Sequence, residues 1–168
     1  MSASGLSPEG HPSGDSGEGH RRGDSPEGHP SGDSAPFVHP VAVRFRDLDP
    51  MGHAHHTLAL VYFEEARAAL WRRLTGRAGL DGIDYILAEA TLRWRARILF
   101  PQTATVAVRV ARVGGRSFVL DYELRSDGGE LLTEGRTVQV MFDYGAGVSK
   151  EIPPDLRERL EALRSGAG

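Results

Sequence analysis

The sequence contains no cysteine, which excludes disulfide bonds, thiolate metal ligands and a cysteine nucleophile. Serine is scarce beyond residue 36, with four in the remaining chain, and none of them lies in a Gly-x-Ser-x-Gly nucleophile elbow. No apolar run approaches the ~18 residues of a membrane-spanning helix, and the N-terminus has no apolar stretch typical of a signal peptide. We therefore expect a cytoplasmic protein without a membrane partner.

Charge is unevenly divided along the chain. Residues 1–36 carry six acidic residues and two arginines, so they hold a net charge of −4 within a total of −3. The rest of the chain, with a net charge of +1, is nearly neutral. A nearly neutral domain has no broad basic surface, which argues against nucleic acid as the main partner.

The first 36 residues have a composition of their own. They are almost entirely Gly, Ser, Pro, Asp, Glu, His and Arg, and a nine-residue unit recurs as SPEGHPSGD, SGEGHRRGD and SPEGHPSGD between residues 7 and 33. Such a segment buries too little apolar surface to offset its chain entropy. We predict a disordered low-complexity tail over 1–36, a flexible polar spacer rather than a weak metal site at its three regularly spaced histidines, and one folded domain over 37–168.

The folded part is predicted to contain one strand, one long helix and four further strands. FVHPVAVRFR (37–46) alternates so that Val41, Val43 and Phe45 share one face, as in a half-buried strand. The helix is predicted from Thr57 to Leu74 and ends at a plausible Gly76 cap. Further strands are predicted at Tyr85–Phe100, Thr103–Val113, Arg116–Ser126 and Glu130–Tyr144, and a last short helix at Pro154–Leu163.

The long helix is unusual because its first half, LALVYF (58–63), is apolar on every side. Such a helix is expected to be buried all round. The order of elements therefore predicts an α+β architecture, in which a curled antiparallel sheet of about five strands wraps around one long central helix.

The segment RFRDLDPMGHAHHTLALVYFEEAR (44–67) resembles the signature of the hotdog-fold acyl-CoA thioesterases of the 4-hydroxybenzoyl-CoA thioesterase-like family. The positions that match the family pattern in register are Asp47, Asp49, Gly52, His53, Tyr62, Phe63, Glu64, Ala66 and Arg67. The resemblance continues through ILAEATLRWRARILF and GELLTEGRTVQVMFD and covers nearly everything from Val41 to Leu160. It implies the hotdog fold and hydrolysis of an acyl-CoA thioester, with no cofactor.

Two departures from that family pattern matter, and they involve three positions. His55 and His56 stand where many relatives have Asn-Asn, and Ala59 replaces a tyrosine near the mouth of the acyl pocket. The resemblance places Gly52, His53, His55 and Ala59 around the substrate. The acyl-group preference stays open.

The resemblance also assigns the catalytic roles. It favours Asp49 over Asp47 as the catalytic carboxylate, which acts either as a nucleophile that forms a mixed anhydride or as a general base on water. Asp-Pro-Met-Gly is equally typical of a type I turn, so the pattern alone leaves a structural role open. The amide of His56, at the start of the helix, is the expected donor to the carbonyl oxygen.

Arginines 93, 95 and 97 alternate along the predicted strand 85–100, so we expect them to project from one face. They either bind the phosphates of CoA or form an exposed sheet face. In the family the pocket lies between two subunits, which implies a homodimer or homotetramer with the active site at the subunit interface.

Other interpretations of the same residues are considered. The His-x-His-His at 53–56 has only His39 as a further histidine in the folded part, so we expect no metal. Glu64, Glu65 and Arg67 are either a second acid–base set or a helical ion pair, and we favour a Glu64–Arg67 pair. A hotdog dehydratase is disfavoured because a His-Phe-Pro-Gly type segment is absent, and a non-catalytic acyl-thioester binding module is the main rival function.

Overall fold

The computed structural model describes residues 35–77 and 82–165. Apart from Ala35 and Pro36, the predicted low-complexity tail lies outside the described residues. The elements follow in the order β1 (Phe37–Ala42), the 3₁₀ turn η1 (Phe45–Asp47), α1 (Leu58–Thr75), β2 (Tyr85–Trp94), β3 (Thr103–Val113), β4 (Ser117–Arg125), β5 (Leu131–Asp143), β6 (Val148–Ser149) and α2 (Pro154–Ser165). The two-residue strand β6 is the one described strand that the sequence did not predict.

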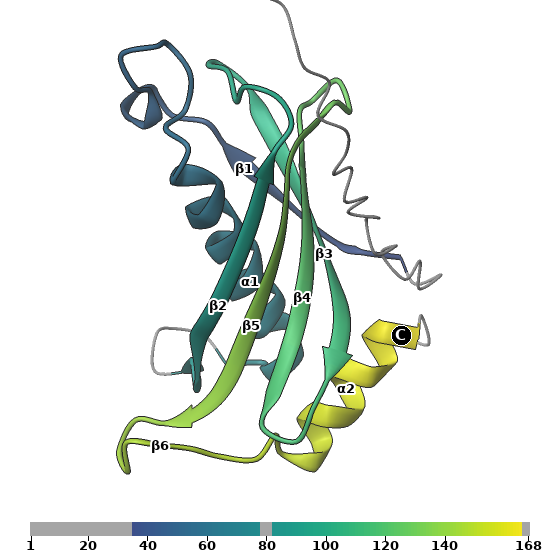
Figure 1. Cartoon of the computed structure of the whole chain (residues 1–168). Coiled ribbons are helices and arrows are strands. Elements are labelled where there is room, and N and C mark those ends of the chain that lie inside the picture. Colours follow the sequence, from purple (N-terminus) through teal and green to yellow (C-terminus); the bar gives the residue numbers. More distant parts are fainter. Residues whose placement is uncertain (1–34, 78–81, 166–168) are drawn as a thin grey trace, which may run out of the picture.

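One curled antiparallel sheet carries the fold. Its strands lie in the order β1-β3-β4-β5-β2, and β6 pairs with β5. Helix α1 lies behind this sheet and α2 lies beside β3 (Figure 1). The edge strand β1 precedes α1 in the sequence, and the other edge strand, β2, follows it.

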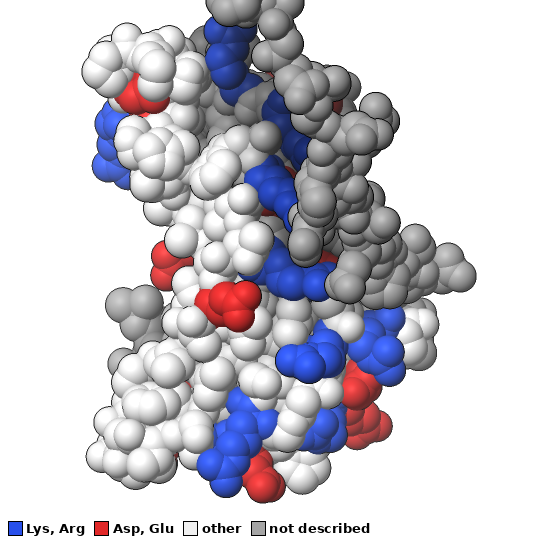
Figure 2. Space-filling model, in the orientation of Figure 1, with Lys and Arg blue, Asp and Glu red and all other residues white. Residues whose placement is uncertain are grey.

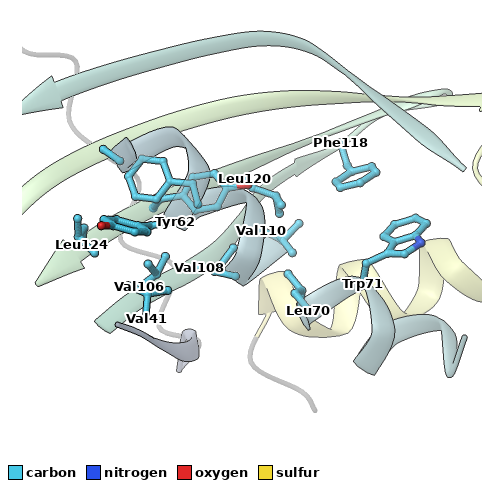
Figure 3. Close-up of a cluster of buried hydrophobic side chains, with 14 of the residues drawn as sticks. Val41, Tyr62, Leu70, Trp71, Val106, Val108, Val110, Phe118, Leu120 and Leu124 are labelled. Atoms are coloured by element: carbon cyan, nitrogen blue, oxygen red, sulfur yellow. The ribbon is translucent and has the colours of Figure 1, made fainter. Parts of the chain in front are cut away.

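The core lies between α1 and the concave face of the sheet. At one end of this core Val106 of β3 and Leu124 of β4 lie near Val41 and Tyr62 (Figure 3). At the other end Val110 of β3 and Phe118 of β4 lie near Leu70 and Trp71 of the helix. Phe63 of the helix packs directly on Gly135 of β5, since a Cβ atom added at Gly135 would lie 2.4 Å from the Phe63 ring. A glycine in this strand is required by the close approach of the helix.

Helix α1 ends at the predicted Gly76 cap, and its last residue, Thr75, lies one residue beyond the predicted end. Gly76 adopts the left-handed conformation, with φ of 69°, and its N–H donates to the carbonyl of Arg72. The predicted burial on every side of the first half was wrong, since Val61 is 42% exposed and Leu58 and Leu60 are only partly buried. Helix α1 packs mainly against β1, β3 and α2. The side of the helix that carries Val61 is open toward β2.

Strand β1 ends earlier than its alternating pattern predicts. The Asp47 carboxylate accepts a hydrogen bond from the Arg44 N–H at 2.8 Å, and this contact turns the chain into the 3₁₀ turn η1. Val41 and Val43 are buried as expected, but Phe45 is 74% exposed, so its predicted place on the buried face was wrong. Local side-chain hydrogen bonding overrides the alternation here.

Strand β2 also stops short of its predicted end, at Trp94 rather than Phe100. The N–H groups of Arg95 and Ala96 both donate to the carbonyl of Leu132, at 2.8 and 3.1 Å, which breaks the ladder. The carbonyl of Ile98 then accepts from the Ala54 N–H at 2.8 Å. The segment after β2 is thereby tied to the loop before α1 instead of to the sheet.

The sheet face turned away from α1 is charged. Lys and Arg side chains run along this face with acidic side chains between them (Figure 2). Ion pairs on the strands join Arg136 to Asp121 at 2.6 Å and Arg125 to Glu123 at 2.9 Å. Among the described helices, neither combines the length and the apolar character needed to cross a membrane.

Candidate active site

The loop between η1 and α1 holds Asp49 through its own backbone. The Asp49 N–H donates to the carbonyl of His53 at 2.9 Å, and the Gly52 N–H donates to the carbonyl of Asp49 at 3.0 Å. Gly52 has φ of 82°, a left-handed conformation that suits glycine at such a turn. The loop is a tight hairpin closed by the bridge between Leu48 and Ala54.

The Asp49 carboxylate is almost fully buried, with 5% of its side chain exposed. Its Oδ1 accepts a hydrogen bond from the Met51 N–H at 2.8 Å, and its Oδ2 lies 3.5 Å from Nδ1 of His53. Oδ1 therefore fixes the side chain, while Oδ2 has only the longer contact to the imidazole. One carboxylate oxygen of Asp49 therefore stabilises the turn, and the other forms no short hydrogen bond.

Asp47, the other aspartate of the loop, has a structural role. Its carboxylate is buried and accepts from the hydroxyl of Tyr62 at 2.9 Å, and its backbone carbonyl accepts from the His55 N–H at 2.8 Å. Burial, and then the hydrogen bond to Asp47, raise the pKa of Tyr62 above its ordinary value, so the phenol stays a donor. Asp47 thus ties the loop to the first turn of α1.

Asp49 faces a cavity of about 370 Å³, which we call the Asp49 cavity. It lies between the loop before α1 and the segment after β2. The residues that line it are Asp49, Met51, His53, Ala54, His56, Trp94, Arg95, Ala96, Arg97 and Ile98. A carboxylate, an imidazole, a helix-start residue and two guanidinium groups therefore share one chamber.

His56 and Trp94 join the two walls of this cavity. The Trp94 Nε1–H donates to the carbonyl of His56 at 3.2 Å, and the two rings meet edge to face at 6.1 Å. Within residues 35–77 and 82–165, the His56 N–H has no hydrogen-bond acceptor. A cavity-lining residue thus carries a free amide two residues before α1, where the positive end of the helix dipole lies.

Three of the residues expected around the substrate lie outside the lining of the Asp49 cavity. Gly52 shapes the turn, and His55 accepts or donates at Nδ1 with the Thr57 hydroxyl at 2.9 Å. Ala59 is fully buried in the core, where it cannot contact a ligand in this cavity. Of the histidines, His53 and His56 line the cavity.

The three arginines do not share one strand face as predicted. Arg93 is in β2, Arg95 follows its end, and Arg97 lies in the segment after it, because β2 ends at Trp94. Arg95 and Arg97 line the cavity, whereas Arg93 does not. Arg95 is already paired with Glu134, to which its Nη2 donates at 2.6 Å and its Nε at 2.9 Å.

The predicted ion pair between Glu64 and Arg67 was wrong. Glu64 is exposed, whereas Arg67 is buried and its Nη1 donates to the Tyr122 hydroxyl at 3.4 Å. The helix turn that carries them directs the two side chains to different surroundings. As for metals, no three His, Asp or Glu side chains of the described ranges are grouped as a metal site requires.

Trp94 and the Asp47–Tyr62 pair were missed as site residues by the sequence reasoning. The signal that could have identified Trp94 is its position between alternating arginines. Tyr62 gave no such local signal, because it lies on an apolar helix face 15 residues from Asp47. Chemically, the site can present a carboxylate to an electrophilic carbonyl, donate one N–H to its oxygen and attract an anionic leaving group.

The fold is shared with proteins of known structure. A family model described as the thioesterase-like superfamily matches residues 43–160. A predicted thioesterase from Bacillus stearothermophilus superposes with a TM-score of 0.72 at 24% identity and covers 77% of this chain and 96% of its own. A thioesterase from Thermus thermophilus, solved with coenzyme A and zinc, has a TM-score of 0.69 at 29% identity and covers 79% and 96%.

One curated sequence is also similar. The uncharacterized protein YsmA of Bacillus subtilis is 24% identical over 124 residues, which is 74% of this chain and 84% of its own length. Together with the structural neighbours, the curled sheet and its single long helix confirm the predicted hotdog fold.

Proposed function

We propose that this chain, which belongs to the thioesterase-like superfamily, hydrolyses an acyl-CoA thioester to the free acid and CoA. The observation that carries the proposal is the Asp49 cavity, which is lined both by Asp49, whose carboxylate is nearly buried, and by His56, whose N–H is free. A carboxylate and an unpaired amide are the two groups that thioester hydrolysis needs at its carbonyl carbon and oxygen.

The proposed reaction places the thioester carbonyl between these two groups. The His56 N–H donates to the carbonyl oxygen, where negative charge develops in the transition state. Asp49 Oδ2 either attacks the carbonyl carbon, which expels the CoA thiolate and leaves a mixed anhydride for water to cleave, or removes a proton from the water that attacks directly. Either route uses the oxygen that the Met51 N–H leaves free.

The leaving group is proposed to be CoA because of the cations at the cavity. Arg97 lines the cavity and is exposed, so it can reach a phosphate, whereas Arg95 is engaged by Glu134. The similar Thermus thermophilus thioesterase, solved with coenzyme A, supports this leaving group. Since CoA thioesters are intracellular metabolites, the proposal also places the reaction in the cytoplasm.

The functional unit is proposed to be a homodimer, or a homotetramer built from it, with the active site at the subunit interface. Strand β2 is an edge strand, and most of its side chains are exposed, among them Leu87 at 40% and Trp94 at 50%. Such an edge invites pairing with a second copy of itself about a twofold axis. A groove between α1 and β2 connects this edge with the open side of the helix at Val61.

A non-catalytic acyl-thioester binding module is the second candidate. The hydrogen bond from the Met51 N–H to Asp49 favours it, because this contact is what a carboxylate makes when its role is to stabilise a turn. In that case the chain binds an acyl thioester without cleaving it.

Release of free thiol from a panel of acyl-CoA thioesters separates the two candidates. The panel spans aromatic and medium-chain acyl groups, because the acyl preference is open. We expect enzyme-dependent thiol release from at least one member, in proportion to protein concentration. Saturable binding of an acyl-CoA without thiol release would establish the binding module instead.

A further inference from the structure

Arg67 is a buried cation. It is 4% exposed, although it belongs to α1 and lines the large groove beside that helix. Its Nη1 donates to the Tyr122 hydroxyl at 3.4 Å, and its guanidinium carbon lies 5.9 Å from the centre of the Tyr85 ring. Its Nε–H has no hydrogen-bond partner in the described part of the chain.

The hydrogen-bond and ring partners of Arg67 supply no negative charge. Burial raises the pKa of the Tyr122 and Tyr85 phenols, so both remain neutral. Behind Tyr122 the network continues through the Thr137 hydroxyl at 3.0 Å, which is also neutral. Among the ion pairs of the described residues, none involves Arg67. A guanidinium withdrawn from water without a carboxylate is strongly destabilising unless an anion reaches it.

The groove beside α1 gives an anion access to Arg67. We call it the α1–β2 groove; its volume is about 1160 Å³. Val61, Ile83, Ile86 and Leu87 give it apolar walls, which suits an acyl chain. Glu64 and Glu65 also line it, but Glu64 is exposed and Glu65 lies 3.7 Å from Arg44, so the groove combines two acidic residues with the cations Arg67 and Arg72.

The dimer proposed above would bring this groove to an Asp49 cavity. If β2 (Tyr85–Trp94) pairs antiparallel with its copy along its whole length, Tyr85 lies opposite Trp94 of the partner subunit. Tyr85 lines the α1–β2 groove and Trp94 lines the Asp49 cavity. An acyl chain whose carbonyl lies in the cavity of one subunit would then extend into the groove of the other.

We propose that Arg67 binds a carboxylate at the distal end of the acyl group, so that the preferred substrates are CoA thioesters of dicarboxylic acids. The inference rests on the proposed function for the position of the thioester, and for the carboxylate it rests on a buried guanidinium whose Nε–H has no acceptor and which forms no ion pair among the described residues. Two N–H groups of one guanidinium suit a carboxylate, which accepts them side by side.

Binding of two non-hydrolysable thioethers tests this assignment independently of hydrolysis. S-(5-carboxypentyl)-CoA and S-hexyl-CoA have the same chain length and differ in the terminal carboxylate. We expect the wild-type protein to bind the carboxylated ligand at least about tenfold more tightly by calorimetry, since a charge-assisted contact is gained. In Arg67→Met that ratio falls toward one, whereas Arg73→Met, an exposed arginine of the same helix that does not line the groove, keeps it.

Arg67→Lys, which keeps the charge, retains part of the preference and guards against misfolding of the Met variant. Equal affinities of wild type for the two thioethers, or an unchanged ratio in Arg67→Met, would overturn the proposal. A third result would also overturn it: a wild-type affinity ratio near one, together with dissociation of Arg67→Met into monomers. The anion that Arg67 binds would then come from a second copy of the chain. An intact ratio without thiol release from any acyl-CoA would remove the hydrolase and leave this assignment standing.

Discussion

The hydroxyl of Tyr62 donates a 2.9 Å hydrogen bond to the carboxylate of Asp47, and this contact joins helix α1 to the loop that carries Asp49. The same Asp47 carboxylate accepts from the Arg44 N–H at 2.8 Å. One buried side chain thus fixes both the entry to the loop and its distance from the helix start. The position of the proposed catalytic carboxylate therefore depends on a residue that does not line the Asp49 cavity.

Replacement of Tyr62 by Phe removes that donor and leaves a buried carboxylate with one fewer hydrogen bond. We expect the free energy of unfolding to fall by about 1–3 kcal/mol, measured by urea denaturation. Tyr144→Phe is the matched control, because the Tyr144 hydroxyl also donates, to the Tyr85 carbonyl at 3.0 Å, but Tyr144 is 63% exposed. Water replaces that contact, and the control should change stability by less than about 0.5 kcal/mol. An equal loss in both variants would contradict the role given to Asp47.

Replacement of Asp49 by Asn tests the carboxylate itself. Asn keeps an oxygen that can accept from the Met51 N–H, so the loop conformation is retained while the charge is lost. We expect turnover to fall by at least ~10²-fold with substrate binding largely kept, as for a group that acts in the transition state. The assay is thiol release under saturating substrate.

Asp143→Asn is the control for that experiment. Asp143, the last residue of β5, also accepts backbone N–H groups at its Oδ1, from Gly145 and Ala146 at 2.9 Å, but it does not line the Asp49 cavity. Turnover should be unchanged. If Asp49→Asn kept comparable activity, Asp49 would be a turn residue and the binding module would be the better account.

Local sequence signals predicted the elements well but not all of their ends. Helix α1 could be placed within one residue because its cap, Gly76, acts locally. The end of β2 could not be placed in this way, since it depends on hydrogen bonds with Leu132 and Ala54, which are distant in sequence. These bonds hold the segment Arg95–Ile98 away from the strand ladder. Alternation in RWRAR therefore overextended the strand.

The same limit applies to the site. Family-matching positions near the turn, such as Asp49 and His53, do line the cavity, whereas Ala59 points into the core despite lying one helical turn from His56. The contribution of Trp94 depends on a hydrogen bond across 38 residues. The burial of Arg67 depends likewise on Tyr122, which comes from β4.

Replacement of Gly135 by Ala tests the close packing of α1 on the sheet. The added Cβ would lie 2.4 Å from the Phe63 ring, and the ring has little room because Tyr122 stacks on it at 4.6 Å. We expect a loss of about 1–3 kcal/mol in the free energy of unfolding from overpacking. Gly128→Ala, whose Cβ meets nothing closer than 3.7 Å, should stay within about 0.5 kcal/mol of wild type. Equal stability of the two variants would place Phe63 farther from β5.

Replacement of Leu87 by Asp tests β2 as the dimer edge. Leu87 is 40% exposed on that strand, and a buried, unpaired charge at a self-paired edge is unfavourable. We expect the variant to dissociate into monomers at concentrations where the wild type is dimeric, as measured by light scattering. Val148→Asp, 55% exposed on β6, should leave the mass unchanged. A Leu87→Asp dimer of wild-type stability would move the interface elsewhere.

Arg97 and Arg93 give a matched pair for the recognition of CoA. Both are exposed, but Arg97 lines the Asp49 cavity and Arg93 does not. If Arg97 binds a phosphate of CoA, Arg97→Ala should raise KM for an acyl-CoA by roughly tenfold, as expected for loss of a charge-assisted contact. KM for the same acyl group on N-acetylcysteamine, which has no phosphate, should not change. Arg93→Ala should leave both values near wild type. A rise in KM for both thioesters would mean that Arg97 acts on the acyl group or on the loop. An unchanged KM for both would mean that cations other than Arg97 bind the phosphates of CoA.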